Sequence, residues 1–164
     1  MAGLKENLSR HFSSGSGPLT GTYALVLALT HSRMIRVGKL GRFLFPAGYY
    51  VYIGSAFGPG GLPSRIHRHL KKDKRLHWHI DYLRKQAVVE EVWISRGHTK
   101  SEHVWARFLE NHSAASMPVK GFGCSDCTCS THLFHVDSRS CFTRIASSAH
   151  RGLPGDAPPI CIKL

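Results

Sequence analysis

Arg65 and His69 stand one helical turn apart in a basic stretch of the sequence, and this spacing suggests phosphate chemistry. Residues four apart on a helix share a face, so both side chains can meet the same ligand. The guanidinium is a planar fork of donors that matches phosphate oxygens, and a histidine can serve as a general base near neutral pH. The pair therefore predicts a phosphate site. The alternative is a solvated basic face of a helix.

Glu102 is a candidate ligand for a metal ion. It is predicted in the first turn of a helix, with Trp105 and Ala106 three and four residues further on, so its carboxylate lies beside the apolar face. One carboxylate together with several waters suits Mg²⁺ or Mn²⁺. A first-turn glutamate can also simply complement the helix dipole. Glu110 is the second choice as ligand.

Two tyrosines, Tyr23 and Tyr52, lie in predicted strands and could act on a water molecule. A phenol with its ordinary pKa of about 10 is a poor base unless a cation or a neighbour lowers that pKa. A base role therefore requires the metal or Arg65 close by. The alternative is packing in the core or across strands, which we expect for Tyr49 and Tyr50.

The segment HWHID at 77–81 brings together His77, His79 and Asp81, which are possible ligands of a metal or phosphate. Helix caps and salt bridges explain these three residues more simply.

A second group of potential metal ligands has types that suit Zn²⁺, but its C-x2-C-x-C-x2-H spacing folds poorly around a tetrahedral ion. A turn in which Asp126 accepts hydrogen bonds from nearby backbone amides, with small buried thiols, explains the segment without metal. We favour the turn and keep zinc as the alternative. The group consists of Cys124, Cys127, Cys129 and His132.

The charge of the chain favours a polyanionic partner. Lysine and arginine number 22 against 10 acidic residues, which gives a net charge of +12 with histidines neutral. Nucleic acid is the expected partner, DNA in the first place with RNA not excluded; a well-solvated basic surface is the alternative. Phosphate contacts that do not read the bases are expected from Arg68, Lys71, Lys72, Lys74 and Arg75.

With 164 residues, the chain can form one domain with a hydrophobic core, but not two with separate cores. No apolar stretch approaches the ~20 residues that span a bilayer, and the polar N-terminus lacks the apolar region of a signal peptide. We therefore expect a cytoplasmic protein with no membrane partner. The five cysteines suit no disulfide framework.

Hydrophobic periodicity predicts an α+β domain, a small antiparallel sheet flanked by helices, over residues 19–137. Residues 1–18 end in the Ser/Gly run SSGSGP, which predicts a flexible segment, and 138–164 are rich in Ser, Gly and Pro, which predicts a mostly disordered tail. The predicted strands are 21–29, 34–40 and 42–45 in a meander, then 48–56, 87–95 and 132–136; the predicted helices are 63–73, 77–86 and 100–111, the last with Val104, Trp105, Phe108 and Leu109 facing inward.

GTY at 21–23, YIG at 52–54, and later helices that carry Arg65 and Glu102 form a combination that resembles the GIY-YIG nuclease superfamily. GYYVYIGSAFGPGGLPSRIHRHL, HWHIDYL and SDCTCSTHLF are similar to a less studied branch of it, whose members are found near or fused to endonuclease III. The resemblance covers about residues 19–136.

The resemblance implies a small α/β sandwich whose antiparallel sheet holds both motifs, and an endonuclease that hydrolyses DNA, in repair or in processing of structured DNA. It implies Mg²⁺ (or Mn²⁺) on Glu102, phosphate on Arg65, and a water positioned by Tyr23, Tyr52 and His69. It also implies association with a base-excision-repair glycosylase of the endonuclease III type. Gly21 and Gly54 are expected where backbone approaches closely.

The sequence departs from the superfamily pattern in several ways. GTY replaces GIY, and MIRVGKLGRFLF lies between the two motifs and is expected to form an extended hairpin. Ser55 stands where many relatives have a lysine, and GPGG shifts the arginine further along, so one cation of the site is either missing or supplied by Arg68 or Lys72. Two other functions stay open on these residues: a noncatalytic nucleic-acid-binding module on the same fold, and a zinc-stabilised interaction protein.

Overall fold

The computed structural model describes residue 12 and residues 19–124, 127–153 and 159–164. The flexible segment predicted for 1–18 therefore lies outside the described residues except for Phe12, which packs against the core. Asp126, expected to organise a turn, also lies outside them.

The main sheet has five strands, and every neighbouring pair is antiparallel. β1 (Gly21–Leu29) is the central strand and pairs with β4 (Gly48–Ala56) on one side and β5 (Val88–Arg96) on the other. β6 (Leu133–Val136) pairs with the first part of β4, and β7 (Ile160–Lys163) pairs with β5. The two strands predicted to carry GTY and YIG are thus direct neighbours.

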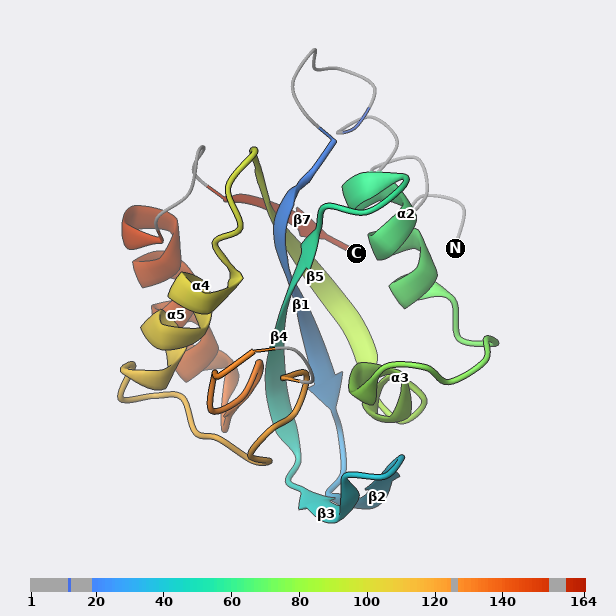
Figure 1. Ribbon diagram of the computed structural model, residues 1–164. Coiled ribbons are helices and arrows are strands. Elements are labelled where there is room, and N and C mark those ends of the chain that lie inside the picture. Colours follow the sequence, from blue (N-terminus) through green and yellow to red (C-terminus); the bar gives the residue numbers. More distant parts are fainter. Residues whose placement is uncertain (1–11, 13–18, 125–126, 154–158) are drawn as a thin grey trace.

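β2 (Arg33–Val37) and β3 (Gly41–Phe45) form a two-stranded sheet of their own, at the end of the molecule where β1 and β4 connect to them (Figure 1). The extended hairpin is confirmed. The meander that would continue from β1 into this hairpin is wrong, because β1 forms its hydrogen bonds with β4 and β5 instead.

Helices cover both faces of the main sheet, which confirms the predicted α+β class (Figure 1). α2 (Gly61–Leu70) and α3 (His79–Arg84) lie on one face, and α4 (Glu102–Glu110) and α5 (Arg139–Gly152) on the other. Successive side chains of a strand point to opposite faces, so the odd-numbered residues of β1 pack under α2 and α3, whereas its even-numbered residues pack under α4 and α5. Among the described helices, none has the length and apolar character needed to traverse a bilayer.

The described residues of the C-terminal part form α5 and β7, so the prediction of a mostly disordered tail over 138–164 is wrong. Phe142, Ile145 and Ala149 recur at helical spacing and bury one face of α5 against the sheet, and the Ser138 hydroxyl accepts a hydrogen bond from the Cys141 N–H at 3.3 Å. In β7, Ile162 is buried against the sheet. In α5, this packing outweighs the disorder expected from the serine content.

In α4, Trp105 and Leu109 are buried as predicted, and Phe108 is partly buried. Val104 is 46% exposed, which corrects the expectation that it faces inward. Ala106 takes its place on the buried stripe, because the position after Trp105 continues that face towards Leu109.

Candidate functional site

Tyr23 on β1 lies opposite Gly54 on β4, and its ring crosses directly over that glycine. A Cβ atom at Gly54 would lie 2.4 Å from the Tyr23 hydroxyl oxygen. At Gly21, a Cβ atom would lie 2.1 Å from the carbonyl oxygen of Ser95 on β5. Both glycines therefore allow a close approach, as predicted, and the one in YIG makes room for the tyrosine of GTY.

Beyond Gly54, the Tyr23 side chain contacts His69 of α2. The Tyr23 hydroxyl oxygen and His69 Nε2 are 2.7 Å apart, and the histidine is 1% exposed. Burial, reinforced by the positive charge of Lys74, lowers the pKa of His69 to about 3, so the imidazole is neutral at pH 7. The opposite ring atom, Nδ1, has no hydrogen-bond partner within the part of the chain that is described.

Tyr52 completes this buried group. Its ring centroid lies 6.1 Å from that of His69 and 6.1 Å from that of Phe122, and the residue is 8% exposed. Burial raises the pKa of both Tyr23 and Tyr52 above that of a free phenol. Both hydroxyls are therefore protonated at neutral pH, which suits hydrogen bonding better than base catalysis.

Arg65 stacks on Trp78, which immediately precedes α3. The centre of its guanidinium lies 4.4 Å from the Trp78 ring centroid, and that of Arg68 lies 4.0 Å away. The same indole lies 5.2 Å from the His69 ring. Arg65 is close enough to both buried phenols that its charge lowers their pKa, in opposition to burial. Sequence reasoning missed Trp78, although its place in HWHID could have suggested a stacking role.

Glu102 lies in the first turn of α4, on the face of the sheet opposite Tyr23, and its carboxylate lies 3.7 Å from His103 Nε2. The N–H of Ser101 donates to the Thr22 hydroxyl at 3.0 Å, which ties the start of α4 to the residue before Tyr23. After burial and neighbouring charges, Glu102 also raises the pKa of Tyr23 and Tyr52, so its carboxylate is in electrostatic range of both. Its side chain is 15% exposed. The second choice, Glu110, is exposed at the opposite end of α4.

Asp81 of α3 forms salt bridges and caps the helix, which is the simpler of the two roles expected for the HWHID segment. Its buried carboxylate accepts hydrogen bonds from Arg68 at 3.2–3.3 Å, lies 2.7 Å from Lys74 Nζ, and accepts the N–H groups of His77 and Trp78 at 3.0 Å. Burial opposes its ionisation, but the bonds from Lys74 and the two backbone groups prevail and lower the pKa of Asp81 to about 2. Arg68 and Lys74 are thus engaged within the protein.

The other basic residues predicted to contact nucleic acid remain on the surface. The exposed ones are Lys71, Lys72 and Arg75.

Arg84 is a second residue that sequence reasoning missed. Its guanidinium is buried and donates to the carbonyl oxygens of His69 at 3.3 Å, Leu70 at 3.3 Å and Ala87 at 2.8 Å. These bonds satisfy the free carbonyl groups at the end of α2 and hold the backbone of His69 in place. An arginine in a short amphipathic helix gives no signal of this role.

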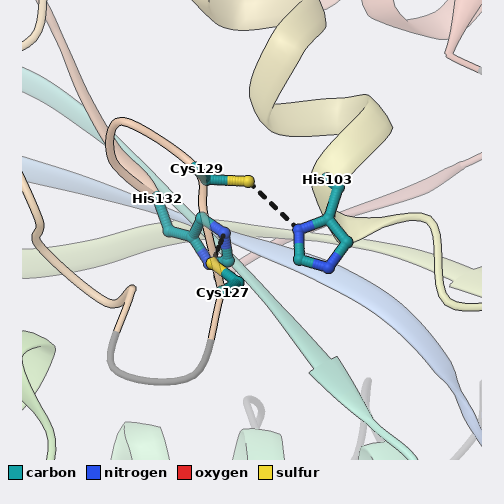
Figure 2. A group of neighbouring side chains, drawn as sticks. All are labelled: His103, Cys127, Cys129 and His132. Carbon is teal, nitrogen blue, oxygen red and sulfur yellow. Dashed lines mark hydrogen bonds between the residues drawn. The ribbon is translucent and has the colours of Figure 1, made fainter.

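A group of metal-ligating side chains lies beside these residues, between the first turn of α4 and the segment before β6 (Figure 2). It contains His103, Cys127, Cys129 and His132, with one ligand atom from each within 4.8 Å of all the others. His103 was missed by sequence reasoning because it lies 24 residues before Cys127. Cys124, which the spacing had suggested, is outside the group.

His79 anchors the start of this segment. Its Nδ1 accepts a hydrogen bond from the Gly123 N–H at 3.0 Å, and its ring lies 5.5 Å from that of Phe122. A Cβ atom at Gly123 would lie 3.1 Å from both the Tyr52 ring and His132. The segment is therefore in contact with the buried tyrosine.

Two hollows in the described surface lie away from the predicted site residues. The larger, of about 430 Å³, is lined by residues of β5, α5 and β7, among them Trp93, Arg139 and Phe142, on the face away from Tyr23. No predicted site residue lines either hollow. Tyr23, Tyr52 and His69 are buried, whereas Arg65 and Glu102 are partly exposed.

Comparison with known families gives one match, over residues 22–154, to a domain of unknown function, DUF123. The chain belongs to the DUF123 family. The DUF123 match includes Tyr23, Tyr52, Arg65, His69 and Glu102, and all four residues of the His/Cys group. No curated protein and no solved structure matches the chain. The DUF123 description states no activity, so any function has to be argued from the geometry.

Proposed function

We propose that this protein is a divalent-metal-dependent endonuclease that hydrolyses phosphodiester bonds in DNA. The observation that carries the proposal is the 2.7 Å contact between Tyr23 and the buried His69, with Arg65 and Glu102 in electrostatic range of the same phenol. A guanidinium, a carboxylate and an oriented hydroxyl are the groups that metal-assisted hydrolysis uses. The GIY-YIG resemblance assigns the same residues.

Glu102 and Arg65 would stabilise the negative charge that develops on the phosphate oxygens in the transition state. Hydrolysis concentrates negative charge on the nonbridging and leaving oxygens, so the half-buried guanidinium of Arg65 stabilises the transition state more than the substrate. Glu102 fits Mg²⁺ or Mn²⁺ because it is a single, partly exposed carboxylate that leaves room for water ligands. When bound, the cation would supply Lewis-acid stabilisation of the same oxygens.

Tyr23 would position the attacking water. In the tautomer with the proton on Nδ1, His69 Nε2 accepts the hydrogen bond of the Tyr23 hydroxyl, which leaves the phenolic oxygen free to accept a bond from water. Because burial raises the pKa of Tyr23, we assign it this positioning role and not that of a base. His69 then fixes the hydroxyl without touching the phosphate.

The second function is a nucleic-acid-binding module that has lost turnover. It is favoured by the burial of Tyr23 and Tyr52, which are 2% and 8% exposed, because a water that they position needs access to their hydroxyls. The exposed basic residues after α2 would bind nucleic acid with or without catalysis.

Cleavage of plasmid, flapped and branched DNA with Mg²⁺ or Mn²⁺ separates these functions. Glu102→Gln should abolish cutting but leave DNA binding unchanged, and Tyr23→Phe should slow it about 100-fold through loss of orientation. Arg65→Ala should slow it about 100- to 1,000-fold. Glu110→Gln is the matched control in the same helix and should cut normally. Cutting that is equal in the wild type and Glu102→Gln would refute the nuclease, and binding without cutting by the wild type would leave the binding module.

A further inference from the structure

We propose that His103, Cys127, Cys129 and His132 bind one zinc ion, which joins the first turn of α4 to the segment before β6. Two sulfur and two imidazole ligands are the donor set of structural zinc sites, whereas Mg²⁺ prefers oxygen. This site is therefore distinct in chemistry from the metal proposed on Glu102. Figure 2 shows the four side chains converging from two separate parts of the chain.

The distances within the group are close to those of a tetrahedral site. His103 Nδ1 lies 3.1 Å from Cys129 Sγ, and His132 Nε2 lies 3.5 Å from Cys127 Sγ. Ligand atoms around zinc, at bond lengths of 2.0–2.3 Å, lie about 3.3–3.8 Å apart. The widest pair, within 4.8 Å, has to close by about 1 Å. The His103 side chain is 48% exposed and can move by that amount.

One ligand is held rigidly, as a structural site needs. His132 is 5% exposed, its N–H donates to the Phe122 carbonyl at 2.8 Å, and its own carbonyl accepts the Ile53 N–H at 2.9 Å. These bonds fix it on the edge of β4, one residue beyond Tyr52. The two cysteines that face it come from a stretch of small polar residues with little apolar surface, so a metal cross-link would stabilise the position of this stretch.

The four ligands lie next to residues of the proposed nuclease site, so a bound zinc ion would affect that site. His103 directly follows Glu102, and the His132 side of the group contacts the same segment that packs on Tyr52. The ion would therefore fix the carboxylate of Glu102 relative to the tyrosines. This consequence rests on the proposed nuclease function; the zinc site itself does not.

Metal analysis of the full chain, purified with a thiol reductant and without chelator, tests the site. The expected result is one zinc per chain, and replacement by Co²⁺ should give the visible absorption of a tetrahedral thiolate site. Cys127→Ser and His103→Ala should each weaken zinc binding at least tenfold and lower the Tm of the zinc-loaded protein by about 5 °C or more. His103→Cys, which supplies another ligand, should retain zinc with a changed Co²⁺ spectrum.

Cys124→Ser is the matched control from the same segment and should keep one zinc. Loss of zinc in this control, with retention in His103→Ala, would overturn the proposed ligand set. A wild-type protein that takes up no zinc or Co²⁺ with all thiols reduced would overturn the site, and a Cys127–Cys129 disulfide that persists under reductant would do the same. Because the readouts are stoichiometry, spectrum and Tm, a protein that binds zinc but cuts no DNA would refute the nuclease and leave this inference intact.

Discussion

At the scale of single residues, the Tyr23 ring reaches His69 only because position 54 has no side chain. Gly54→Ala should therefore displace Tyr23 and lower the free energy of unfolding by about 1–3 kcal/mol, as overpacking in a core does. Urea unfolding measures the change. Gly58→Ala is the matched control, since a Cβ atom there meets nothing within 4 Å, and equal stabilities of the two variants would contradict the crossing.

His69 makes a second prediction at this scale. Its pKa falls from 6.5 to about 3 on folding, so between these values the unfolded chain binds a proton that the folded protein does not. The contribution of His69 is therefore to make stability decrease as pH falls from about 6.5 towards 3, with no further change below the folded pKa. His69→Gln should flatten this dependence, measured by urea unfolding at pH 7.5 and 4.5. If the wild type and His69→Gln lose the same free energy of unfolding between pH 7.5 and 4.5, then His69 is protonated in the folded protein at the lower pH.

At the scale of elements, Asp81 connects the end of α2, the loop after it and the start of α3. Asp81→Asn leaves Lys74 buried without its partner and should lower the free energy of unfolding by about 3 kcal/mol. Its folded pKa of about 2 lies below the ordinary 3.8, so this stabilisation is present above pH 3.8 and is lost as pH falls towards 2. Thermal unfolding at pH 7 compares the variant with Asp73→Asn, an exposed carboxylate in the same loop whose loss should change little.

The elements also show which parts of the structure the sequence could predict. Strands β1 and β4 could be predicted because Tyr23, Leu25 and Leu27 alternate with residues that pack on the opposite face, and the Arg65–His69 pair could be placed on one helix by spacing alone. The pairing of β7 with β5 could not, since strand order depends on contacts between distant segments. For the same reason, the sequence did not indicate His103 as a metal ligand, because its partners lie in a distant segment of the chain.

At the scale of the whole molecule, the net charge of +12 predicts nucleic-acid binding that weakens as salt rises. The exposed cations after α2 should carry much of this dependence, because Arg68 and Lys74 are engaged with Asp81. Replacing Lys71, Lys72 and Arg75 by alanine should weaken DNA binding and reduce the slope of log affinity against log salt by up to about 3. Fluorescence anisotropy at several salt concentrations measures this.

The matched control is a variant with the same loss of charge in the β2–β3 hairpin. Arg33, Arg36 and Arg42 are exposed there, and their replacement by alanine should leave affinity and slope nearer those of the wild type. If the two triple variants behave alike, net charge and not the surface after α2 determines binding.

The position of β7 at the margin of the main sheet bears on how this protein should be handled in the laboratory. Its pairing with Glu91–Ile94 covers hydrogen-bonding groups of β5, and Leu164 adds a further bond to Glu90. Shortened chains that end before Ile160 would leave a bare β5 rim open to the same rim of another molecule, and so would invite aggregation. Affinity tags are therefore safer at the N-terminus than fused directly to Leu164.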